Sequence, residues 1–257
     1  MALLELKNVS ISFGGLKVID DVSFKVESQK IFGLIGPNGA GKTTMFNIIT
    51  ANHKPNMGVV TFLGKNILRY RPNTIVNLGI ARTFQNIRLF HSMSVLDNVL
   101  IGLHQEAKYS FFEAALRFGR YFKEERRIKE RAKWLLEYMG LGDKMYVTAS
   151  TLSYGNCRKV EIARALATNP KLLLLDEPAA GMNPKETQEL GMLILKMQKD
   201  FHLSVLLIEH DMPFVNALCQ EVLVLDYGRK LFCGTPQEAV NNTEVIAAYL
   251  GDFCARS

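Results

Sequence analysis

One stretch decides the fold: Gly36-Pro-Asn-Gly-Ala-Gly-Lys-Thr43. It follows residues 30–35, in which an apolar run after Lys30 has the pattern of a buried strand, and precedes residues 43–50, which have the pattern of a helix. A glycine-rich turn in this position directs its backbone N–H groups at phosphate oxygens, and the helix adds its positive N-terminal end. The pattern therefore predicts a loop that binds the phosphates of ATP.

The alternative is a glycine-rich turn that matches the pattern by accident, and the flanking strand and helix argue against it. Within the loop, Lys42 is expected to reach the β- and γ-phosphates, and the Thr43 hydroxyl is expected to ligate Mg²⁺. The expected ATP-binding residues are Gly36, Pro37, Asn38, Gly39, Ala40, Gly41, Lys42, Thr43 and Thr44.

A second apolar strand pattern ends in two acidic residues, in Leu172-Leu-Leu-Leu-Asp-Glu-Pro178. Open α/β sheets bind their ligands at the carboxyl ends of the strands. Asp176 would therefore orient the Mg²⁺ shell, and Glu177 would polarise the attacking water as a general base. Alone, an Asp-Glu pair after a strand is as often a solvated turn. Together with the phosphate loop, the pair predicts hydrolysis of ATP.

A third apolar strand, residues 205–208, runs into Glu209-His210-Asp211. A histidine at a strand end can contact the γ-phosphate and hold the catalytic water in line. A surface histidine and a metal cluster are the two other interpretations. No second histidine stands at helical spacing, which argues against the metal, whereas the surface histidine stays open on spacing alone.

Length and composition allow one large domain, or a core domain with a small subdomain, in 257 residues. The four cysteines are far apart, which argues against a zinc site or a disulfide framework and favours a reducing cytoplasm. The longest aliphatic runs are too short to span a membrane, so a membrane process would need another chain to do so. The net charge of +6 indicates either an anionic partner or a mildly basic surface.

The order of patterns along the chain predicts an α/β core with a helical insertion. Strand patterns cover residues 3–9, 22–26 and 59–62, and residues 95–139 are rich in helix patterns. A further helix is expected around residues 185–199, between the second and third apolar strands. We place the boundaries of the insertion near residues 86 and 158.

Between the phosphate loop and Asp176 lies Leu152-Ser-Tyr-Gly-Asn156, followed by a helical run. This stretch resembles the signature motif of ATP-binding-cassette (ABC) ATPases, usually Leu-Ser-Gly-Gly-Gln, and the order of elements over nearly the whole chain is similar to that family. Phe13 matches the aromatic that stacks on adenine. Gln85 matches the glutamine that senses Mg²⁺ and couples to the membrane subunits. Asp176, Glu177 and His210 match the family's Walker B and switch positions.

The resemblance implies a P-loop NTPase core with an N-terminal antiparallel β-subdomain in residues 1–86 and 158–257, and a helical subdomain carrying the signature motif in residues 87–157. It implies Glu177, His210 and Gln85 as catalytic residues, and Thr43, Gln85 and Asp176 as Mg²⁺ ligands. In the family the signature motif closes over ATP held by a partner chain in a head-to-tail dimer. Ser153 and Gly155 are therefore expected to contact the partner's ATP.

Three residues depart from the usual family pattern: Tyr154 and Asn156 in the signature motif, and Asn183 where an aspartate is usual. These departures resemble the subgroup that serves branched-chain amino-acid importers, and within it the larger of the two paired ATPases. The resemblance implies permease subunits, a second ABC ATPase of the same or a related kind and, indirectly, a substrate-binding protein as partners. The expected location is the cytoplasmic face of the cell membrane.

Two other functions remain as alternatives. Related ABC transporters carry other cargo, for example in lipid or lipopolysaccharide export, and share all the motifs quoted above. ABC ATPases that act on DNA or ribosomes usually carry two cassettes or a long coiled-coil insertion. This chain has one phosphate loop and no sustained heptads between residues 100 and 150. No nucleic-acid partner is expected, because no aromatic and basic pattern marks a groove for one.

A basic amphipathic helix is expected within residues 108–133. Phe111, Ala115, Phe118 and Phe122 follow helical spacing, opposite several basic residues. Such a face packs on its own domain or touches a membrane surface or a membrane partner, and the sequence leaves both interpretations open.

Overall fold

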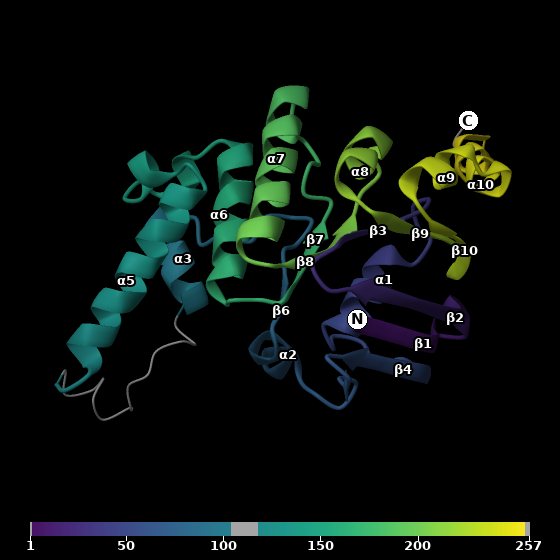
Figure 1. Cartoon of the computed structure of the whole chain (residues 1–257), viewed down its shortest axis with the longest axis horizontal. Coiled ribbons are helices and arrows are strands. Elements are labelled where there is room, and N and C mark those ends of the chain that lie inside the picture. The colour runs from purple at the N-terminus through teal and green to yellow at the C-terminus, as the bar shows by residue number, and fades with distance from the viewer. Residues whose placement is uncertain (1, 104–117, 255–257) are drawn as a thin grey trace. The chain divides into compact units, whose positions relative to one another are not determined.

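The computed structural model describes residues 2–103 and 118–254 (Figure 1). The chain divides into two compact units, one formed by Met1–Arg82 with Lys171–Ser257 and the other by Thr83–Pro170. The expected boundary at residue 158 falls inside helix α6 (Tyr154–Ala167), whereas packing of that helix against α3 and α5 groups all of it with the second unit. Within the described ranges, no helix combines the length and the hydropathy that a membrane span requires.

The first unit contains a six-stranded sheet in the order β10-β9-β3-β8-β7-β6. Every neighbouring pair is parallel except β9 and β10. All residues of β3, β7 and β8 are buried, which explains why these strands are continuous aliphatic runs. The strands are β3 (Ile31–Ile35), β6 (Ile80–Arg82), β7 (Leu172–Asp176), β8 (Ser204–Ile208), β9 (Glu221–Asp226) and β10 (Arg229–Gly234).

The second sheet of this unit is antiparallel and follows the order β2-β1-β4-β5. Its first strand buries Leu4 and Leu6 on one face and exposes Lys7, the alternation expected of a sheet with one solvated face. The expected α/β core with an antiparallel β-subdomain is confirmed. The strands are β1 (Ala2–Phe13), β2 (Leu16–Glu27), β4 (Met57–Phe62) and β5 (Lys65–Asn66).

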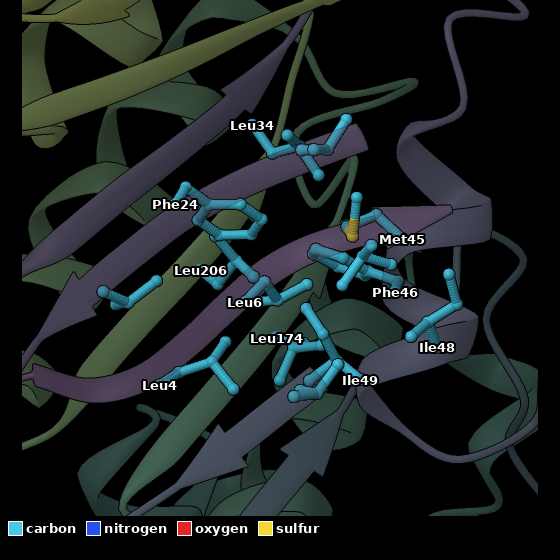
Figure 2. Packing of buried hydrophobic residues seen from close by; sticks show 14 of the residues in the cluster. Leu4, Leu6, Phe24, Leu34, Met45, Phe46, Ile48, Ile49, Leu174 and Leu206 are labelled. Carbon is cyan, nitrogen blue, oxygen red and sulfur yellow. The ribbon is translucent and has the colours of Figure 1, made fainter. Parts of the chain in front are cut away.

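Helix α1 (Lys42–Ile49) joins the two sheets into one hydrophobic core. Figure 2 shows Phe46 and Ile49 of this helix beside Leu6 of the antiparallel sheet and Leu174 of the six-stranded sheet. These four side chains are fully buried, and burying a side chain of this size is worth about 1.5–3 kcal/mol. The helix that follows the phosphate loop is therefore anchored along its apolar face.

The remaining helices of the first unit connect and flank the strands. Four of them have proline at one of their first two positions, where its missing N–H costs no helical hydrogen bond. The helix expected around residues 185–199 is present as α7. The helices are α2 (Pro72–Leu78), α7 (Pro184–Asp200), α8 (Met212–Leu218), α9 (Pro236–Asn241) and α10 (Thr243–Cys254).

The described part of the second unit is helical, with α3 (Val95–Leu103) and α5 (Tyr121–Tyr138) packed against α6. Gly102 lets α3 approach α6 closely, because a Cβ at that position would lie 2.4 Å from the carbonyl oxygen of Arg164. This contact sets the position of α6, which begins at the signature motif.

The amphipathic helix expected in residues 108–133 is confirmed from Tyr121 onward, as the first part of α5, and is wrong for residues 118–120. Phe111 and Ala115 lie outside the described residues. Residues 118–120 form a turn with Gly119 at φ +63°, and α5 begins only at Tyr121, so Phe118 and Phe122 do not share one continuous helix. Glycine adopts this left-handed conformation without the steric cost that ends a helix for other residues.

Candidate nucleotide site

The phosphate loop follows β3 and has a backbone that only glycine adopts at two of its positions. At Gly36, φ is +143° and a Cβ would lie 2.0 Å from the carbonyl oxygen of Leu225. At Gly41, φ is +99° and a Cβ would lie 2.5 Å from the Cδ1 atom of Ile19. Each glycine therefore serves two purposes: it adopts a backbone conformation that other residues rarely adopt, and it lets a neighbouring strand, β9 or β2, approach the loop closely.

Lys42 crosses the loop from the first turn of α1. Its side chain is buried, and its Nζ donates hydrogen bonds to the carbonyl oxygens of Gly36 at 2.7 Å and Pro37 at 2.8 Å. The other expected ATP contacts differ in their exposure to solvent. Asn38, Gly39 and Thr43 are exposed, Thr44 is half-buried, and Ala40 is buried.

The turn between β9 and β10 braces the loop from outside. Gly228 donates its backbone N–H to the Ala40 carbonyl at 3.2 Å and accepts a hydrogen bond from the Asp20 N–H at 2.8 Å. A Cβ on Gly228 would lie 2.2 Å from the Val18 carbonyl oxygen, so the turn fits closely against β2. The loop conformation is therefore held by backbone contacts from strands β2 and β9 and from the turn that follows β9.

Phe13 ends strand β1 and is 44% exposed. Its ring meets His53 in an edge-to-face contact with centroids 5.2 Å apart. An aromatic ring with this much free surface can stack on a flat ligand such as adenine.

Three strand ends meet at one edge of the parallel sheet. Leu34 of β3 pairs with Ile208 of β8, and Ile208 also pairs with Asp176 of β7. The phosphate loop, Glu177 and His210 follow these three strands, so the sheet brings the three predicted motifs to the same edge. Ligands of open α/β sheets bind at this edge.

Asp176 is buried and paired with Arg82, a residue that the motif analysis did not single out. Arg82 ends β6, and its NH2 group donates to Asp176 Oδ2 at 2.8 Å. Its NH1 group donates to Asn47 Oδ1 at 2.7 Å, and its guanidinium lies over the Phe46 ring at 5.3 Å from the centroid. Arg82 thus ties the aspartate of the site to helix α1.

Glu177 has a strained backbone and a direct histidine partner. Its φ is +46°, a conformation that is uncommon for residues other than glycine and concentrates at functional sites. The Glu177 N–H donates to the Ile208 carbonyl at 2.9 Å, and a hydrogen bond of 2.8 Å joins Glu177 Oε1 to His210 Nε2. A carboxylate held in this way is fitted to accept a proton from water.

Glu209 is a further buried carboxylate at this edge that the sequence did not single out for a role. It is 4% exposed and accepts hydrogen bonds from the Ala179 N–H at 2.9 Å and the His210 N–H at 3.1 Å. Burial raises the pKa of Glu209, and the backbone donors work against that rise. Its oxygens join the loop after Glu177 to the loop that carries His210.

Asn183, where the family usually has an aspartate, caps helix α7. Its side chain accepts from the Glu186 N–H at 3.0 Å, and the Glu186 carboxylate accepts from the Asn183 N–H at 3.1 Å. This capping box satisfies two backbone donors at the helix start.

Three of the predicted site residues belong to the second unit. Gln85 is exposed on residues 84–88, which we call the glutamine segment. Ser153 is exposed at the N-cap of α6, and in the described chain its hydroxyl does not cap its own helix. Gly155 is buried in the first turn of α6.

A buried ion pair on α6 holds the glutamine segment. Arg158 is 0% exposed and Glu161 2%, and their side chains meet at 2.8 Å. Arg158 also donates to the carbonyl oxygens of Phe84 at 2.7 Å and Gln85 at 3.0 Å. Glu161 Oε1 accepts from the Phe84 N–H at 3.3 Å. Both residues look like part of a solvated helix face in the sequence, and so they were not predicted.

The donors expected for Mg²⁺ fit the chemistry of that ion. Asp176 supplies a carboxylate, and Thr43 supplies an exposed hydroxyl at the first turn of α1. Mg²⁺ prefers oxygen ligands and is commonly held by one or two carboxylates together with substrate phosphates and water. These residues can therefore hold the metal in the way that nucleotide sites do.

Known proteins are similar to this chain in both sequence and fold. Residues 19–180 match the family described as ABC transporter, and residues 229–253 match the family described as branched-chain amino acid ATP-binding cassette transporter. The high-affinity branched-chain amino acid transport ATP-binding protein LivG of Salmonella typhimurium is 41% identical over 250 residues, which cover 97% of this chain and 98% of LivG. The corresponding protein BraF of Pseudomonas aeruginosa is 40% identical with the same coverage.

Among solved structures, the ADP conformation of MJ1267, an ATP-binding cassette of an ABC transporter, superposes with a TM-score of 0.85 at 32% identity. The match covers 98% of this chain and 99% of MJ1267. Family match, full-length relatives and the arrangement of phosphate loop, Asp176, Glu177 and His210 agree. The chain belongs to the ABC transporter family, as one of its ATP-binding proteins.

Proposed function

We propose that this chain is the ATP-hydrolysing subunit of a transporter that imports branched-chain amino acids. The observation that carries the chemistry is the hydrogen bond between Glu177 and His210 at the sheet edge that also holds the phosphate loop. The proposed cargo is inferred from the relatives. They are named as branched-chain amino acid transport proteins, and this chain matches them along nearly their whole length.

In the proposed reaction the phosphate loop and Lys42 bind the β- and γ-phosphates, and Phe13 stacks on adenine. Glu177 takes a proton from the attacking water, and His210, bonded to the same carboxylate, fixes the direction of that carboxylate. The histidine tautomer with a proton on Nε2 donates to Glu177 Oε1. Mg²⁺ held by Thr43, Asp176 and Gln85 would neutralise charge on the phosphates.

The proposal includes a second ATPase subunit. Ser153 is exposed at the start of α6, and its hydroxyl is not engaged in capping that helix within the described chain. With the N–H groups of the first turn, it forms the wall that would cover ATP bound to a partner chain in a head-to-tail dimer. Permease subunits, and through them a substrate-binding protein, complete the proposed transporter at the cytoplasmic face of the membrane.

The test replaces Glu177 by Gln in the transporter purified with its permease chains and reconstituted in liposomes. A loss of the general base lowers ATP turnover by about 10²–10⁴-fold, while ATP binding stays within about twofold, since Gln fills the same volume. ATP-driven leucine uptake is lost to the same extent. The matched control is Glu244→Gln, an exposed glutamate on α10, which leaves turnover and uptake unchanged.

Unchanged turnover in Glu177→Gln would exclude the general-base role. The importer assignment would be overturned if the transporter took up no branched-chain amino acid and if a lipid or lipopolysaccharide stimulated its ATP turnover instead. Purification of the chain with ribosomes or DNA in place of permeases would overturn it as well.

A further inference from the structure

Tyr154, the residue that departs most from the usual signature motif, makes a contact that explains its presence. It is the first residue of α6, directly between Ser153 and Gly155. The residue is 44% exposed, but its hydroxyl accepts a hydrogen bond from Arg158 NH2 at 3.2 Å. The Arg158 guanidinium also lies 5.8 Å from the centre of the tyrosine ring, within the range of a cation–π contact.

Arg158 connects this tyrosine to the glutamine segment. The same NH2 group that donates to Tyr154 donates to the Gln85 carbonyl at 3.0 Å, and NH1 donates to the Phe84 carbonyl at 2.7 Å. Arg158 Nε has no hydrogen-bond partner among the described residues, so every polar contact of this buried side chain is made by NH1 and NH2.

Glu161 completes the connection from the next turn of α6. Its Oε2 accepts from Arg158 NH1 at 2.8 Å, and its Oε1 accepts from the backbone N–H groups of Phe84 at 3.3 Å and Arg88 at 3.5 Å. The glutamine segment therefore presents both carbonyls and N–H groups to one buried ion pair. Charge-assisted bonds of this kind are stronger than bonds between neutral groups.

We propose that Tyr154 is a positioning residue for Gln85, which it serves through Arg158. Without the tyrosine, the Arg158 guanidinium loses its contact with the signature motif and is oriented less well. Its hydrogen bond to the Gln85 carbonyl is then weaker. Tyr154 thereby locks the glutamine segment to the turn of α6 that carries Ser153 and Gly155. This role rests on the proposed function only where the effect on ATP turnover is concerned, because the locking itself is a property of the chain alone.

The test is Tyr154→Phe, which removes the hydroxyl and keeps the ring. The matched control is Tyr227→Phe, an exposed tyrosine of the β9–β10 turn in the other unit. Hydrogen exchange of the purified chain measures the locking directly, at the backbone N–H groups of Phe84 and Arg88. Tyr154→Phe removes the hydrogen bond between the tyrosine hydroxyl and Arg158, and Arg158 is paired with Glu161, the acceptor of these two N–H groups. Exchange of the two N–H groups therefore rises by about three- to tenfold in Tyr154→Phe and stays unchanged in Tyr227→Phe.

Kinetics of the assembled transporter then test the consequence for Gln85. Tyr154→Phe lowers kcat by about three- to tenfold with the KM for ATP unchanged, and raises the Mg²⁺ concentration needed for half-maximal turnover. Unchanged exchange at Phe84 and Arg88 overturns the proposal, whatever the kinetics show. Faster exchange with unchanged kcat and Mg²⁺ dependence also overturns it, since Tyr154 would then stabilise the segment without positioning Gln85. If the transporter failed to transport leucine, the importer assignment would be wrong. The hydrogen-exchange test of Tyr154 would still hold, because it is made on the purified chain.

Discussion

The phosphate loop and the glutamine segment are both irregular stretches next to a helix of the site, but different forces hold them. Backbone geometry holds the loop, through glycines at Gly36 and Gly41 and through the Gly228 turn that braces Ala40. Side chains hold the glutamine segment, through the buried pair of Arg158 and Glu161. A loop held by its backbone geometry requires glycines at fixed spacing in the sequence. The glutamine segment is instead held by side chains more than 70 positions away in the sequence.

The largest effect is expected for Gly36→Ala. A Cβ 2.0 Å from a backbone oxygen cannot be relieved by a rotamer, so overpacking adds to the strain of a left-handed φ. Together these terms lower the free energy of unfolding by about 2–6 kcal/mol, and the clash with a backbone oxygen places Gly36→Ala near the upper end. Denaturant unfolding of the purified chain measures this.

Gly39→Ala is the control for that variant. Gly39 has a φ of +80°, and no described atom lies within 4 Å of its Cβ position, so only the backbone strain of about 1–2 kcal/mol remains. Equal stabilities of the two alanine variants would show that close approach does not determine the loop, and the comparison with the glutamine segment would fail.

The next effect is expected for Arg158→Met. This change leaves Glu161 buried without its partner and frees the carbonyls of Phe84 and Gln85, and removing one member of a buried pair costs about 3–5 kcal/mol. Because the cost arises from the unpaired charge, adding Glu161→Gln recovers about 1 kcal/mol or more. Denaturant unfolding of the two single variants and the double variant measures this coupling. Additive effects of the two substitutions would mean that the pair does not act as a unit.

The same contrast explains what could be predicted from the sequence. Strands β3, β7 and β8 were predicted because their burial on both faces requires aliphatic runs, and the loop was predicted because its backbone requires glycine. Strand β6 was missed, because it is three residues long and depends on pairing with β7. A helix through residue 119 was predicted wrongly, because the spacing of the phenylalanines outweighed the glycine between them.

The site divides in the same way. Lys42, Asp176, Glu177 and His210 stand at strand ends or in the loop, where their chemistry can be inferred from position. Their supports could not be inferred: Arg82 is indistinguishable from a charged strand end, and Arg158 from an exposed helix residue. Only the three-dimensional arrangement shows that each of these arginines is buried against an acid.

The smallest effect is expected at Asn183, which tests whether burial sets the strength of a side-chain support. Asn183 caps α7 with hydrogen bonds of 3.0 and 3.1 Å, within the 2.7–3.2 Å range of the Arg158 bonds, but Asn183 is exposed and Glu186 is only half-buried. Loss of such a cap in Asn183→Ala costs about 1 kcal/mol, a shift in the melting temperature of about 2–4 °C for a chain of this size. Asn183→Asp keeps the acceptor and restores the usual family residue, so its melting temperature should match that of the original chain. If Asn183→Ala cost as much as Arg158→Met, burial would not be the reason for the strength of the Arg158 contact. If it cost about 1 kcal/mol, as we expect, the difference of several kcal/mol between two hydrogen-bonded side chains would be due to the removal of water from one of them.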